Sequence, residues 1–68
     1  MTSIRKGLTF RRTTPLGETT IEYRVTKRQG REVFVDRQIV AGRGSRKPEN
    51  VRLTLATIEK IYERRDRP

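Results

Sequence analysis

The sequence predicts a small α+β domain, in which an antiparallel sheet of three to four strands is followed by one C-terminal amphipathic helix. Two observations lead to this fold class. Apolar and polar side chains alternate with a period of two through much of residues 8–40, as in strands with one buried face. Apolar residues then recur at helical spacing between residues 55 and 62. A chain of 68 residues is expected to form a single domain, 1–68.

The first predicted strand is "GLTFRR", in which Leu8 and Phe10 alternate with polar residues. The segment "TPLGE" interrupts this pattern. Pro15 suits the second position of a type I turn, and Gly17 suits a position where φ is positive. A first hairpin is therefore expected, leading into the run "TTIEYRVTK".

A second hairpin is predicted between "TTIEYRVTK" and "REVFVDRQIV". If residues 28–30 form a three-residue loop with its glycine in the left-handed region, Val25 lies opposite Val33 and Tyr23 opposite Val35. Both strands then turn their apolar residues to the same face. A slip of one residue would turn one strand's apolar set to the wrong face, so this register is favoured.

The C-terminal segment allows two interpretations. Val51 and the apolar residues after it fit one helix that begins at Pro48, but Val51, Leu53 and Leu55 also alternate as in a strand. We favour a short strand "NVRL", then Thr54 as N-cap of a helix over about residues 55–65. The residues that this helix would bury are Leu55, Ile58, Ile61 and Tyr62.

Charge indicates the class of partner. The chain has 17 Lys and Arg against eight Asp and Glu, a net charge of +9, which favours a polyanionic ligand. The excess falls in residues 1–17 (+4), in the turn "KRQGR" at 27–31 (+3) and in residues 42–52 (+3). The segments 18–26 and 32–41 each carry −1, and 53–68 carries +1. Within the expected domain, the basic amino arm is 1–7, the sheet 8–40, the basic loop 41–50, and the short strand and helix 51–65.

Several function classes are excluded by residue content. With no His and no Cys, neither a structural zinc site nor a common hydrolytic centre is expected. "GRGSRK" lacks the spacing of a nucleotide-hydrolysing phosphate loop. We therefore expect no enzyme, no metal, no cofactor and no small-molecule substrate. "MTSIRKGLTF" contains no apolar run, so we expect no signal peptide and no membrane span, and a cytoplasmic protein.

The candidate binding residues are cations in the turns and loops and an aromatic side chain on a strand. Phe34 leaves the apolar face and falls near Arg24, where a nucleobase could stack on its ring. The competing interpretations are a solvated, soluble loop and a Phe34 that packs in a dimer interface. The full candidate set is Arg11, Arg24, Arg28, Arg31, Phe34, Arg37, Arg43, Arg46 and Lys47.

The order of "KRQGREVFVDRQIV", a basic loop with glycines, and "KPENVRLTLATIEKI" resembles the single-stranded-DNA-binding domain of the positive cofactor four family of transcriptional coactivators. The resemblance covers about residues 24–63. It implies a homodimer whose curved sheets bind single strands, with Arg24, Phe34 and Arg37 on or near the binding strands. The chain also resembles the arm-binding domains of some transposon integrases, which insert a sheet into the major groove of a duplex.

The expected function is therefore nucleic-acid binding by a small basic homodimer, with DNA favoured over RNA and either single-stranded DNA or a transcription-related site as the ligand. Phosphate contacts position a protein without reading sequence, so binding should tolerate many sequences. The alternative is a protein-interaction module, such as a phage or plasmid regulator, that docks on an acidic partner surface. A protein that binds structural RNA would use the same physics.

Overall fold

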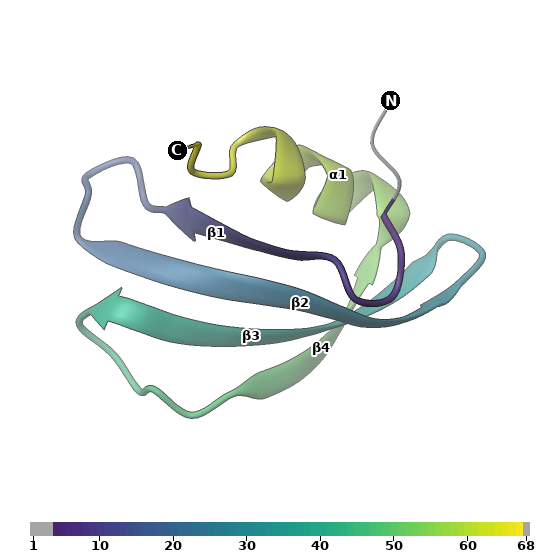
Figure 1. The fold of residues 1–68 in the computed structure, drawn as a ribbon, viewed down its shortest axis with the longest axis horizontal. Helices are drawn as coiled ribbons and strands as arrows, with labels where there is room; N and C mark the ends of the chain where they lie inside the picture. Colours follow the sequence, from purple (N-terminus) through teal and green to yellow (C-terminus); the bar gives the residue numbers. More distant parts are fainter. Residues whose placement is uncertain (1–3, 68) are drawn as a thin grey trace.

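The computed structural model describes residues 4–67 and contains a four-stranded antiparallel sheet followed by one C-terminal helix (Figure 1). The strands lie in chain order across the sheet, each paired with the next. This confirms the predicted α+β class, and residues 49–54 are a strand. The elements are β1 (Thr9–Thr13), β2 (Thr19–Gln29), β3 (Glu32–Gly42), β4 (Glu49–Thr54) and α1 (Leu55–Glu63).

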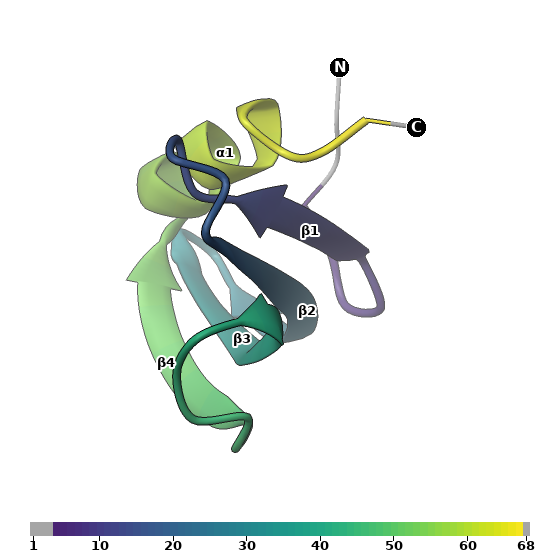
Figure 2. The ribbon, with the colours of Figure 1, turned by 90° about the vertical axis from the view of Figure 1, so that its left-hand side faces the viewer.

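Helix α1 covers one face of the sheet, and no element of residues 4–67 lies over the other face (Figure 2). The predicted cap is confirmed, because the Thr54 hydroxyl accepts a hydrogen bond from the Thr57 amide at 3.2 Å. Ile58 is fully buried against the sheet. No helix in residues 4–67 has the length and apolar composition needed to cross a bilayer. The buried core is Ile4, Phe10, Tyr23, Val25, Val33, Val35 and Ile58.

The predicted register of the second hairpin is wrong. Gln29 pairs with Glu32, so the loop has two residues, and Gly30 has the positive φ of 59° that was expected of it. Such a loop alone would turn the apolar residues of β2 to the wrong face. A bulge between Val25 and Lys27 corrects this, so that Val25 pairs with Val35. The pairing has moved by two residues from the expected one, and a shift of two preserves the faces.

The amino arm is not a free basic segment where the structure describes it. Residues 1–3 of the predicted arm lie outside the described residues. Ile4 is only 1% exposed and belongs to the core, although it stands beside Arg5 and Lys6. The Gly7 amide then donates to the Val25 carbonyl at 2.9 Å. The arm is thus bound to the start of the sheet.

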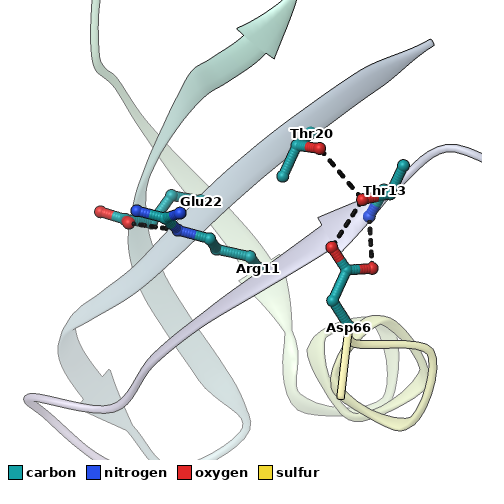
Figure 3. Close-up of polar contacts among 5 residues, drawn as sticks. All are labelled: Arg11, Thr13, Thr20, Glu22 and Asp66. Carbon is teal, nitrogen blue, oxygen red and sulfur yellow. Dashed lines mark hydrogen bonds and ion pairs between the residues drawn. The ribbon is translucent and has the colours of Figure 1, made fainter. Parts of the chain in front are cut away.

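The first hairpin turns as predicted, and the C-terminal tail returns to it. The Gly17 amide donates to the Thr14 carbonyl at 2.8 Å, closing the turn that contains Pro15. At the outer edge of β1, the Asp66 carboxylate accepts hydrogen bonds from the Thr13 amide at 2.9 Å and the Thr13 hydroxyl at 2.5 Å (Figure 3). These two donors lower the pKa of Asp66 below its ordinary value of 3.8, because both favour the charged form.

Candidate nucleic-acid interface

The face of the sheet turned away from α1, here called the open face, carries a mixture of cationic, acidic and amide side chains. It is defined by the alternation of each strand against its buried residues. The one large aromatic side chain among these residues is Phe34, as the sequence predicted. The open face consists of Thr9, Arg11, Glu22, Arg24, Lys27, Phe34, Asp36, Gln38, Asn50 and Arg52.

Phe34 lies between two cations in one row across three strands. Its cross-strand neighbours are Lys27 on β2 and Arg52 on β4. The Lys27 ammonium is 5.8 Å from the centroid of the Phe34 ring, within the range of a cation–π contact. Phe34 is half-buried, so the residue keeps some exposed surface. The row offers one apolar side chain with a cation on each side, of which Arg52 is paired with Glu32 at 4.0 Å.

The next row contains Arg24, which lies across from Asp36 and not from Phe34 as the expected register implied. Arg24 is exposed and forms no salt bridge with any residue in 4–67. Its neighbour Asp36 accepts a hydrogen bond from the Asn50 amide at 2.8 Å. Farther along, Arg11 is paired with Glu22 at 3.0 Å (Figure 3). Arg24 is therefore a freer cation than Arg11.

Two of the candidate cations point elsewhere. Arg37 lies on the helix side of the sheet, where it forms a salt bridge with Glu49 at 3.0 Å. Arg28 follows the bulge, which turns it to the helix side as well. Its guanidinium donates to the Ile4 carbonyl at 2.9 Å and to the Gly30 carbonyl at 3.0 Å. Arg28 therefore contributes to holding the N-terminal segment against the sheet.

The remaining basic clusters lie far apart. Arg31 is at the tip of the β2–β3 hairpin, whereas Arg43, Arg46 and Lys47 are in the β3–β4 loop at the other end of the sheet (Figure 1). The 11 residues of strand β3 lie between them. The clusters thus bracket the open face and do not form one continuous patch.

Lys27 and Arg52 are the interface candidates that sequence reasoning missed. Both belonged to basic clusters, but their position beside Phe34 depends on the bulge in β2 and on the pairing of β3 with β4. The sequence "RQGR" gave no signal that distinguishes a two-residue from a three-residue loop. Only the cross-strand pairing brings these two cations to the aromatic ring.

Comparisons with protein-family models, with curated proteins and with solved structures find no match for this chain. Within residues 4–67, no three acidic side chains gather into a group that could hold a metal ion.

Proposed function

We propose that this protein binds single-stranded nucleic acid, with DNA as the favoured ligand, on the open face. The observation that carries the proposal is the row in which Phe34 lies between Lys27 and Arg52. A base stacked on an aromatic side chain gains about 1–3 kcal/mol, whatever its identity. The flanking cations are positioned for the phosphates on either side of that base. We further propose that the protein acts in the cytoplasm.

The same row favours a single strand over a duplex. In a duplex the faces of the bases are already stacked on each other, so an aromatic ring on an exposed sheet has nothing to stack on. Phosphate contacts from Arg24, Arg52 and the β3–β4 loop do not read sequence, so affinity should vary little between sequences. The preference for single strands distinguishes the proposal from insertion of the sheet into a major groove, which would favour duplex DNA.

The test is fluorescence anisotropy with labelled single-stranded DNA, single-stranded RNA and duplex DNA of equal length. We expect the single-stranded DNA to bind most tightly, and Phe34→Ala to weaken it by roughly tenfold or more, because the stacking surface is lost. Leu16→Ala is the matched control, since Leu16 is an apolar side chain, 83% exposed, on the β1–β2 turn. Equal losses in both variants, or none in Phe34→Ala, would contradict the proposal.

Salt dependence provides an internal check on the same titrations. Five phosphate contacts on a single strand give a log–log slope of about −3.5, and removing one changes it by about 0.7. Arg24→Ala and Arg52→Ala should each produce that change. Lys60→Ala, which removes an exposed cation from α1, should leave the slope as it is.

A second candidate function is docking on an acidic protein surface. The observation that favours it is the mixed charge of the open face, where Glu22, Glu32 and Asp36 lie on or beside it among the cations. These acids repel a continuous phosphate backbone but can pair with the basic side chains that a mainly acidic protein surface also carries. This alternative predicts no binding to any of the oligonucleotides at low salt. It would also predict retention of a protein partner in the presence of excess DNA.

A further inference from the structure

A hollow of about 530 Å³ lies beside the end of β3, where β4 has not yet begun and the β3–β4 loop returns toward the sheet. It is distinct from the row around Phe34. Ile21 and Ile39 of the sheet form one side, and Ser45, Lys47 and Pro48 of the loop form the other. We call it the loop groove.

The loop that walls the groove is held in place by specific contacts. The Gln38 side-chain amide donates to the Arg46 carbonyl at 2.7 Å, and the Arg46 guanidinium donates to the Gly42 carbonyl at 3.2 Å. Gly44 has a φ of 124° and packs so closely on Ile39 that an added Cβ would lie 2.5 Å from the Ile39 Cδ1. The groove is thus a formed feature of the fold and is not a gap under a loose loop.

The lining combines an apolar floor with hydrogen-bonding and cationic groups. Ile21, Ile39 and Pro48 are apolar, and the Arg37–Glu49 salt bridge lies along one wall. Such a pair presents both donors and acceptors toward an occupant. Lys47 is exposed at the loop, in the same segment as Arg43 and Arg46.

We propose that the loop groove binds one nucleotide of the nucleic-acid strand, with its base against Ile39 and Pro48 and its phosphate near Lys47. The volume suits a group of this size, and mostly apolar pockets with a few polar groups are typical of small-ligand sites. The excess of positive charge in the loop complements a phosphate and argues against a neutral occupant. This inference rests on the proposed nucleic-acid-binding function.

The groove and the open face meet at one side chain. Gln38 lies on the open face, paired across strands with Glu22, and it also lines the groove. Ile21, Arg37 and Ile39, which also line the groove, lie on the helix side of the sheet, so a strand on the open face reaches the groove by passing around Gln38 at the end of β3. The loop cations then contact phosphates beyond the sheet, which gives Arg43, Arg46 and Lys47 a role in the same interface.

Isoleucine methyl NMR tests the assignment, because the chain has five isoleucines and two of them line the groove. The probe is a thymidine oligonucleotide, titrated into the full chain. We expect the Ile21 and Ile39 methyl resonances to shift. Ile4 and Ile58, which are buried in the core, serve as internal controls and should not move.

A blocking variant complements the spectra. Ser45→Trp places an indole in the groove from an exposed loop position, and we expect it to weaken oligonucleotide binding roughly tenfold. Ala56→Trp, which adds an indole at an exposed position of α1 outside the groove, is the matched control and should bind like the natural chain. Phe34→Ala should weaken binding but leave the shifts at Ile21 and Ile39 in place at saturation.

The outcomes separate the two proposals. Oligonucleotide binding without shifts at Ile21 and Ile39, and without loss in Ser45→Trp, overturns the groove assignment and leaves the open-face function standing. Absence of any oligonucleotide binding overturns both. If poly-glutamate shifts the Ile21 and Ile39 methyls and the oligonucleotide does not, the groove belongs to an acidic protein partner and the nucleotide assignment is wrong.

Discussion

At the scale of single residues, the glycines of the β3–β4 loop show which sequence features report on packing. "AGRGSRK" predicted a turn through its two glycines. It did not predict that each is also required by a close approach. Gly42 has a φ of 93° and lies against the Glu18 carbonyl, while Gly44 lies on Ile39. The Gly42 contact joins residues 24 positions apart in the chain, which local pattern cannot reveal.

Substitution of Gly42 should therefore be more damaging than substitution of a glycine at a free turn. In Gly42→Ala the new Cβ would collide with the Glu18 carbonyl oxygen and the Thr19 Cα, and both are backbone atoms that move only with their strand. We expect the free energy of unfolding to fall by about 3 kcal/mol or more, from the positive φ and the collision together. Urea denaturation measures this loss.

Gly30→Ala is the matched comparison for that experiment. Gly30 has a positive φ of 59°, but an added Cβ would meet no atom within 4 Å. Only the conformational cost remains, about 1–2 kcal/mol. If both variants lose the same stability, the close approach at Gly42 contributes nothing to the fold.

At the scale of elements, the sequence predicted the local features of each strand and of the helix. It did not predict how the strands pair. Alternation identified the buried face of each strand, and Thr54 with the apolar spacing after it identified the helix. The hairpin register failed because "KRQGR" allows two loop lengths and the bulge at Thr26 leaves no mark in the pattern. The placement of Lys27 and Arg52 beside Phe34 could not be predicted for the same reason, because it depends on the strand pairing.

The contact between the C-terminal tail and β1 uses the Asp66 carboxylate, so it makes the stability of the folded chain depend on pH. The pKa of Asp66 is lower in the folded chain than its ordinary value of 3.8, so its contribution to stability is complete above that value. The contribution is lost as the pH falls through the lower, folded-state pKa. We expect Asp66→Asn to lose less stability than the natural chain between about pH 4 and pH 2, measured by urea denaturation across that range.

The control for this pH dependence is a carboxyl elsewhere on the surface. Glu59→Gln removes an exposed acidic group from α1. This variant should keep the natural chain's difference in the free energy of unfolding between neutral and acid pH. Thr13→Val removes the hydroxyl that donates to Asp66 and should resemble Asp66→Asn. Identical acid sensitivity in all three variants and the natural chain would show that the tail contact is not responsible.

At the scale of the whole molecule, the two edges of the sheet differ. The edge of β1 is covered by the tail, because the Asp66 amide donates to the Arg11 carbonyl at 2.7 Å. The outer edge of β4 is paired with no element in residues 4–67. The Leu55 amide donates to the Arg31 carbonyl, so it points toward β3. Backbone amides alternate in direction along a strand, so those of Asn50 and Arg52 point away from β3, toward the outer edge. An unpaired edge of this kind is a template for another strand.

We propose that a second copy of the chain pairs along this edge, which accounts for the expected homodimer. In an antiparallel pairing with Arg52 opposite the partner's Asn50, no like charges face each other, and the open faces join into one surface with two copies of Phe34. Arg52→Pro removes an outward amide while keeping the pairing of β4 with β3, so sedimentation velocity should find a monomer. Arg52→Ala, which keeps the amide, should remain a dimer.

The proline variant must be shown to fold before its mass is interpreted. Its circular dichroism and thermal transition should resemble those of Arg52→Ala, because edge strands accept proline where the amide faces outward. A folded, monomeric Arg52→Pro beside a dimeric Arg52→Ala would place the interface on the β4 edge. A natural chain that sediments as a monomer at every concentration, or a proline variant that stays dimeric, contradicts edge pairing and leaves one copy of the open face as the complete binding surface.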